Sequence, residues 1–121
     1  MQATGDARRL APNVLAERCD GYRVELDLLV PEDLAVFTGH FPAFPVVPGV
    51  LQVDWVMRFA QTLLNVGSAT GAPAIKFSQL LRPGDRCMLT LERSVDGATL
   101  SFALRQGETT FATGRLSVEP R

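Results

Sequence analysis

The sequence contains one histidine, His40, and Asp54 follows it by fourteen residues. Between them, prolines recur at every third position, at Pro42, Pro45 and Pro48. Fixed proline φ angles stiffen the backbone, so they would hold the histidine at a set distance from the residues that follow. Histidine and carboxylate side chains commonly transfer protons in enzymes. The pattern therefore predicts an acid–base site, against the alternative that both side chains are structural.

Gly49 stands at the start of the one long apolar helix that the sequence predicts, over residues 50–66. The first backbone amides of a helix lack intrahelical partners, and a residue without a side chain lets a ligand oxygen approach them. The helix dipole favours negative charge at the same end. We therefore expect the amides of Gly49 and Val50 to bind a developing oxyanion.

Asp54 lies inside this helix, where an ionised carboxylate is costly unless it is paired. Arg58 follows at the fourth position and could satisfy it through an intrahelical ion pair, which is the structural alternative. In the functional alternative, the carboxylate faces a cavity and is kept for proton transfer.

The 121 residues suit a single domain, with residues 1–12 as a flexible end. A net charge of −1 argues against a nucleic-acid-binding protein. Cys19 and Cys87 lack metal-ligand spacing, so we expect two buried or half-buried thiols and no metal site. The N-terminus lacks a signal peptide's apolar core, and polar residues interrupt the apolar region 41–66. These features predict a cytoplasmic protein.

The rest of the chain is expected to form antiparallel strands. A short helical turn is predicted after Pro31, and Gly67, Gly71 and Pro73 predict a loop after the long helix. Several strands and one almost wholly apolar, buried helix predict an α+β fold in which the sheet curls around the helix. Alternation and turn residues predict strands over residues 13–19, 22–30, 74–81, 86–93, 98–106 and 109–118.

A long motif closely resembles the signature of the hotdog-fold 3-hydroxyacyl-[acyl-carrier-protein] dehydratases, the FabA/FabZ-like family. It comprises Gly39-His40-Phe41-Pro42, Pro45, Val47-Pro48-Gly49-Val50-Leu51 and Asp54. Phe77 and the turn Arg82-Pro83-Gly84-Asp85 are also similar, so the resemblance covers roughly residues 13–118. Within the family, Gln52-Val53-Asp54-Trp55 and Arg58 look most like the aryl-polyene-pathway subgroup.

The resemblance implies a dimer in which His40 of one subunit works with Asp54 of the other. It implies β-elimination of water from a 3-hydroxyacyl thioester, with His40 as base, the Gly49 amide on the thioester oxygen, and Asp54 on the departing hydroxyl. Aspartate at this position matches the branch that can also isomerise the new double bond. No metal or redox cofactor is implied, only the phosphopantetheine arm of the acyl carrier protein.

Arg58 departs from the family, which usually has glutamine there to hydrogen-bond the acid. An arginine beside Asp54 would favour the ionised carboxylate, which suits a general acid poorly. Two outcomes are therefore expected. Either Arg58 points away from Asp54, or, as we favour, Asp54 serves to orient the histidine, a water molecule or the hydroxyl.

Substrate and carrier contacts are also implied by the resemblance. The acyl tunnel is expected at Trp55, Phe59 and Phe77. Because the carrier is acidic, a basic rim is expected at Lys76, Arg82 and Arg86, although each could be ordinary surface charge. The alternatives are a hotdog thioesterase and a non-catalytic, carrier-binding subunit of a heterodimer.

Overall fold

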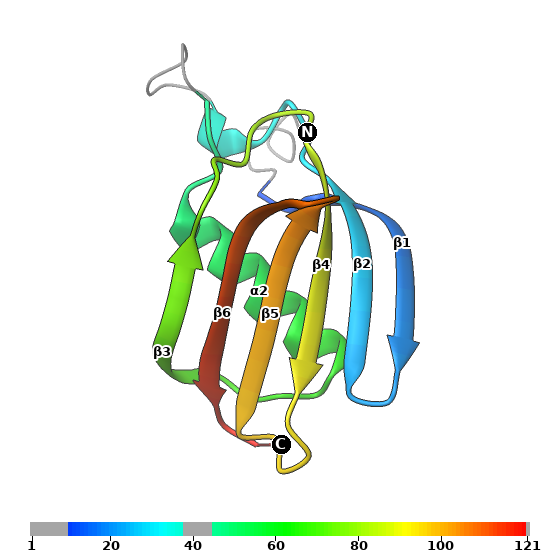
Figure 1. Cartoon of the computed structure of the whole chain (residues 1–121), viewed down its shortest axis with the longest axis vertical. Helices are drawn as coiled ribbons and strands as arrows, with labels where there is room; N and C mark the ends of the chain where they lie inside the picture. Colours follow the sequence, from blue (N-terminus) through cyan, green and yellow to red (C-terminus); the bar gives the residue numbers. More distant parts are fainter. Residues whose placement is uncertain (1–9, 38–44, 121) are drawn as a thin grey trace, which may run out of the picture.

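The computed structural model describes residues 10–37 and 45–120, which form one antiparallel sheet and one long helix (Figure 1). The 3₁₀ helix η1 spans Ala35–Phe37 and the helix α2 spans Gly49–Leu63. The strands are β1 (Asn13–Asp20), β2 (Arg23–Leu29), β3 (Ala69–Phe77), β4 (Arg86–Arg93), β5 (Thr99–Gln106) and β6 (Thr109–Val118). Among these residues no helix is long and apolar enough to cross a membrane.

The six described strands are ordered β1-β2-β4-β5-β6-β3, and every neighbouring pair is antiparallel. Gly21 and Gly107 turn the β1–β2 and β5–β6 hairpins with φ of 61° at both, a conformation that glycine adopts without strain. In the chain, β3 follows α2. It forms an edge of the sheet and pairs with β6.

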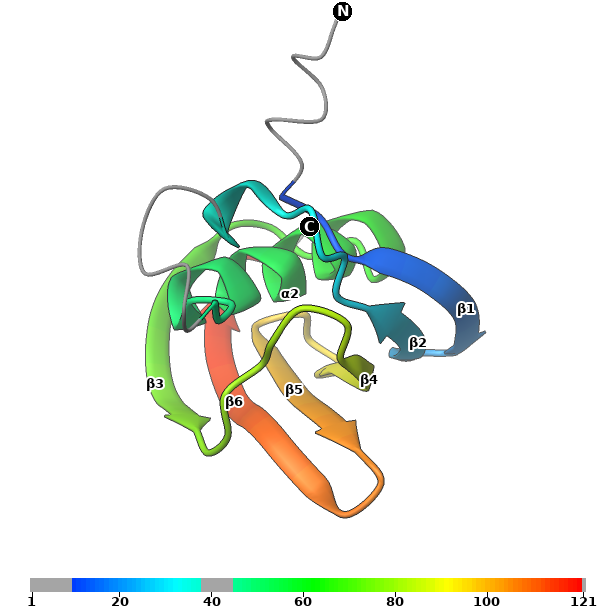
Figure 2. The same ribbon diagram turned by 90° about the horizontal axis from the view of Figure 1, so that it is seen from above.

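The sheet curls around α2, which lies across its concave face (Figure 2). Strands β2, β4 and β5 alternate buried and more exposed residues, as expected when one face of each strand packs on the core. The buried residues on these three strands include Leu26, Leu89 and Leu100, which pack in one cluster with Trp55 and Val56 of α2. The predicted α+β arrangement is confirmed.

Strand β3 differs from the prediction. It begins at Ala69, within the segment expected to be a loop, and ends at Phe77 rather than at residue 81. The pairing with β6 shifts register between Ala69 and Gly71 and again between Gly71 and Ala74. Such bulges, on an edge strand, accommodate the glycine and Pro73 that made the segment look like a loop.

The helix also differs from the prediction. It ends at Leu63 rather than at residue 66, and Asn65 follows in the left-handed conformation with φ 56°. We expected burial almost all round, but Val50 is 81% exposed, whereas Trp55 and Val56 are buried. The reason is that the sheet of a single chain covers only one side of the helix.

Smaller differences concern the segment after β2 and one cysteine. The helical turn expected from Pro31 appears at Ala35–Phe37 as η1. Cys87 is buried as expected, but Cys19 is exposed, because it lies on the edge strand β1.

Candidate active site

The N-terminus of α2 presents unpaired backbone donors. The amides of Leu51 and Gln52 donate to the Pro48 carbonyl over 3.0 and 3.1 Å. The amides of Gly49 and Val50, the first two residues of α2, donate to no described residue. Pro48, the N-cap, offers no side-chain cap. These two amides can therefore donate hydrogen bonds to an anionic oxygen, as helix N-termini do.

Gly49 is also in close contact with an aromatic ring that is distant in the sequence. A Cβ built on it would lie 2.8 Å from Cζ of Phe77, a distance that real side chains do not tolerate. Phe77 is the last residue of β3 and is 48% exposed. The close contact brings the end of the edge strand against the start of the helix, next to the two unpaired amides.

Val47, just before the helix, is held from two sides. Its amide donates to the Leu81 carbonyl over 2.7 Å, and its carbonyl accepts from Nε2 of Gln52 over 3.1 Å. Gln52 is only 4% exposed, and its Oε1 has no hydrogen-bond partner among the described residues. These contacts position the backbone that leads into Gly49. We gave Gln52 no such role from sequence, although an amide in the first turn of an apolar helix was the available signal.

Asp54 and Arg58 form the intrahelical ion pair that was the structural alternative. Nε of Arg58 donates to Oδ2 of Asp54 over 2.7 Å. The Asp54 side chain is 45% exposed and that of Arg58 is 75% exposed, so the premise of a deeply buried acid is wrong for the single chain. The uncovered side of α2 carries this pair, which explains the exposure. Arg58 does not point elsewhere: it contacts the acid.

Asp54 also lines a depression of about 260 Å³. Its other walls are Leu10, Ala11, Trp55 and Arg58. Nε1 of the buried Trp55 donates to the Leu10 carbonyl over 2.6 Å and so fixes the chain ahead of β1 against the helix. This contact spans 45 residues of sequence, and no local pattern predicts it.

The predicted site residues are only partly brought together. Gly49, Val50, Asp54 and Arg58 all lie on α2, and His40 lies outside the described residues. Among the predicted tunnel residues, the Phe77 ring lies against Gly49, and Trp55 lines the same depression as Asp54. Phe59 is partly buried and packs against the core.

The predicted carrier-binding residues come from three different elements. Lys76 lies on β3 and Arg86 on β4, with β6 and β5 between these strands, and Arg82 lies in the loop that joins them. For a metal, the described residues offer no group of three or more His, Cys, Asp or Glu side chains.

An antiparallel sheet curled around one central helix, with free amides at the start of that helix, defines a hotdog-fold protein. The model of the ApeI-like family, described as ApeI dehydratase, matches residues 16–115. The chain therefore belongs to the ApeI-like dehydratase family. The fold and the family resemblance expected from the sequence are confirmed.

Individual relatives agree with this assignment. The chain is 29% identical over 112 residues to 3-hydroxyacyl-[acyl-carrier-protein] dehydratase FabZ of Legionella pneumophila (strain Corby), covering 80% of this chain and 73% of that protein. A chain of the dehydratase heterocomplex ApeI:P from Xenorhabdus doucetiae is 30% identical, with a TM-score of 0.82 and coverage of 91% of this chain and 98% of that one. An uncharacterized protein from Erwinia carotovora subsp. atroseptica is 34% identical, with a TM-score of 0.76 and coverage of 90% and 96%.

Proposed function

We propose that this chain is a dehydratase that removes water from 3-hydroxyacyl thioesters carried on an acyl carrier protein. The observation that carries the proposal is the open N-terminus of α2, where the Gly49 and Val50 amides donate to no described residue. Asp54 lies five positions further along the same helix. An anion-binding helix end and a carboxylate near it suit a reaction that builds negative charge on a thioester oxygen.

In the proposed reaction, a base removes the proton from Cα while the C–O bond at Cβ breaks. The electron pair of the C–H bond becomes the Cα–Cβ double bond, and the hydroxyl leaves as water after taking up a proton from the protonated base or from Asp54. The amides of Gly49 and Val50 would hold the thioester oxygen as charge develops on it. His40, which the described residues do not include, is the proposed base.

For Asp54 we favour an orienting role. Its Oδ2 accepts a hydrogen bond from Arg58 over 2.7 Å, so the carboxylate is already engaged as an acceptor. A carboxylate held in this way can accept a hydrogen bond from the substrate hydroxyl, from water or from the histidine. Donation of the proton to the leaving hydroxyl is the alternative role.

The working unit is proposed to be a dimer, with His40 of one subunit facing Asp54 of the other. The exposed Val50 and the edge strand β3 are features that a second subunit could cover. The relative from Xenorhabdus doucetiae is a heterocomplex, so the second subunit of this protein could be a different chain. The phosphopantetheine arm of the carrier would bring the acyl group, in fatty acid or aryl-polyene-type synthesis in the cytoplasm.

The experiment supplies a 3-hydroxyacyl carrier-protein thioester and follows enoyl absorbance and free thiol separately. Enoyl formation that is lost in His40→Ala supports the proposal. Free thiol without enoyl contradicts it and indicates a thioesterase. If neither product forms, the chain alone is not a dehydratase.

A non-catalytic subunit of a heterodimer is the second candidate function, favoured by the heterocomplex of the relative. It predicts that neither product forms with this chain alone and that enoyl formation appears on mixing with a catalytic partner. In that mixture His40→Ala of this chain would leave the rate unchanged, whereas the dehydratase proposal requires the rate to fall.

A further inference from the structure

The outer face of the sheet, which points away from α2, divides into two electrostatic halves. On β1 and β2 the basic residues Arg18 and Arg23 are paired with acids, whereas Arg86, at the start of β4, is exposed and pairs with no acid among the described residues. Arg18 contacts Glu25 at 3.1 Å and Asp27 at 3.0 Å, and Arg23 contacts Glu25 at 3.2 Å. Hydrogen bonds from Arg18 hold the pKa values of Glu25 and Asp27 below their usual range. The charge of this half is therefore largely compensated.

The other half, formed by β5, β6 and β3, has charge of one sign. Each strand carries one charged residue, and all three are basic: Arg105, Arg115 and Lys76. All three are exposed, and none pairs with an acid among the described residues. We call these three residues, on the outer surface of β5, β6 and β3, the basic face.

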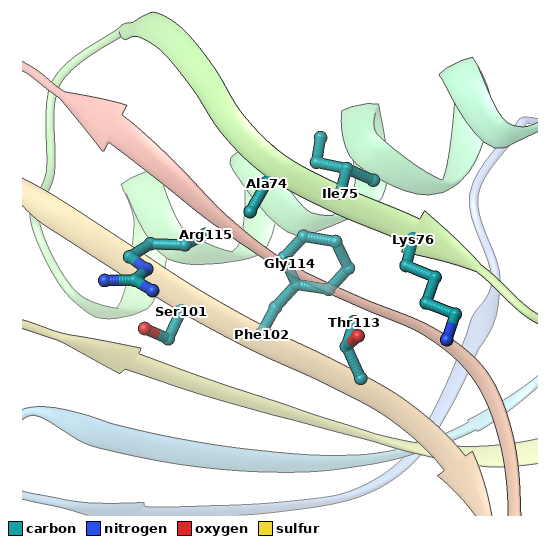
Figure 3. A pocket seen from close by; sticks show the side chains of 8 residues that line it. All are labelled: Ala74, Ile75, Lys76, Ser101, Phe102, Thr113, Gly114 and Arg115. Carbon is teal, nitrogen blue, oxygen red and sulfur yellow. The ribbon is translucent and has the colours of Figure 1, made fainter.

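A shallow depression of about 440 Å³ lies in this face. Lys76 and Arg115 lie at its opposite ends, with the Thr113 and Ser101 hydroxyls between them (Figure 3). Strand pairing fixes this arrangement, because Lys76 is opposite Thr113, and Arg115 is opposite Ser101. Two separated cations with hydroxyl groups between them can bind several acidic groups spread over a surface.

We propose that the basic face is the docking surface for an acidic protein partner, which, given the proposed function, is the acyl carrier protein. The inference rests on that function for the identity of the partner. We infer an acidic partner from charge complementarity, because three unpaired cations attract an acidic surface and steer its approach. Their spread over three strands suits an extended acidic surface better than a single small anion.

The basic face and the start of α2 lie on opposite sides of the sheet and approach each other at the end of β3. Lys76 and Phe77 are adjacent in β3, and side chains alternate between the faces of a strand. Lys76 therefore lies on the outer face, while the ring of Phe77 lies against Gly49. A carrier docked at Lys76 would release its arm near the C-terminal end of β3, whose last residue, Phe77, contacts Gly49 of the proposed oxyanion site. This placement extends the set of carrier contacts from Lys76 to Arg115 and Arg105.

The experiment compares Lys76→Glu and Arg115→Glu with Arg23→Glu. Arg23→Glu makes the same charge change on the same outer face, but within the compensated half. For the carrier-borne substrate, we expect each test variant to raise KM about tenfold with kcat retained, as for charges that guide association. Turnover of a short pantetheine thioester without carrier should change about as little in the test variants as in Arg23→Glu. Thermal melting confirms that the variants fold.

Direct binding keeps the test independent of catalysis. Fluorescence anisotropy with labelled carrier protein should show weaker binding for Arg115→Glu than for Arg23→Glu. Added salt should weaken wild-type binding more than that of Arg115→Glu. Equal binding by Arg115→Glu and wild type, or an equal loss in Arg23→Glu, would overturn the docking surface. If no wild-type enoyl forms, the proposed function fails, and the anisotropy result still decides whether the basic face binds an acidic protein.

Discussion

Gly49 and Phe77 are 28 residues apart in the chain, yet the Phe77 ring occupies the space that a side chain at Gly49 would need. A Cβ at Gly49 would lie 2.8, 2.9 and 3.1 Å from three carbons of that ring. The glycine therefore has two roles that can be separated: it admits the edge strand to the helix, and it leaves the helix amides accessible.

Gly49→Ala should lower the free energy of unfolding by about 1 kcal/mol, at the low end of overpacking costs, because the half-exposed Phe77 ring can shift and alanine favours the helix. Adding Phe77→Leu should recover most of this loss in urea denaturation. If accessibility of the amides also matters, the double variant will regain stability but not the rate of enoyl formation. Gly49→Ala with wild-type stability would contradict the close packing. Phe77→Leu alone is the control for the loss of the ring.

Asp54→Asn should reduce kcat by roughly 10²–10⁴-fold if the carboxylate takes part in proton transfer. Stability should change little, because an exposed ion pair four residues apart in a helix contributes only about 0.3–0.5 kcal/mol. Enoyl formation and urea denaturation measure the two effects. A wild-type rate in Asp54→Asn would remove this residue from the mechanism.

Arg58→Gln tests whether the arginine positions that carboxylate. Losing the 2.7 Å contact leaves the Asp54 side chain free to adopt other orientations. We expect kcat for enoyl formation to fall while KM changes little, because the carboxylate is then held less firmly in its reactive position. An unchanged kcat would show that Arg58 does not position Asp54, and Arg23→Gln serves as a control for loss of a cation.

Trp55→Phe should remove the hydrogen bond to the Leu10 carbonyl and destabilise the protein by about 1 kcal/mol beyond any packing loss. The backbone ¹⁵N heteronuclear NOE at Leu10 and Ala11 should fall, while its values in β4 and β5 should stay as in the wild type. Unchanged values at Leu10 and Ala11 would mean that this bond does not hold the segment over Asp54.

Burial, aided by the negative charge of Asp85, raises the pKa of the Cys87 thiol from 9.0 to about 12. The unfolded chain therefore loses this proton near pH 9, whereas the folded protein keeps it. The free energy of unfolding should fall by about 1.4 kcal/mol per pH unit between these values. Cys87→Ala should remove this slope in urea denaturation, and Cys19→Ala, at an exposed thiol, should keep it. Equal slopes in wild type and Cys87→Ala would contradict the assignment.

The sequence by itself determined most of the local structure. Alternation in β2, β4 and β5, together with turn glycines such as Gly21, predicts strands without any knowledge of their neighbours. The apolar run after Gly49 predicts α2, and the spacing of His40, Gly49 and Asp54 indicates the family. These signals are local, because periodicity and helix starts depend on residues a few positions apart.

Only the tertiary structure decided which distant residues meet. The start of β3 was missed because pairing with β6 across two register shifts, rather than local propensity, makes residues 69–73 a strand. The contact of Trp55 with Leu10 and that of Gly49 with Phe77 follow from how the sheet curls around the helix. The basic face likewise exists because strand order places Lys76, Arg115 and Arg105 on neighbouring strands. Packing sets these relationships, and no short stretch of sequence contains them.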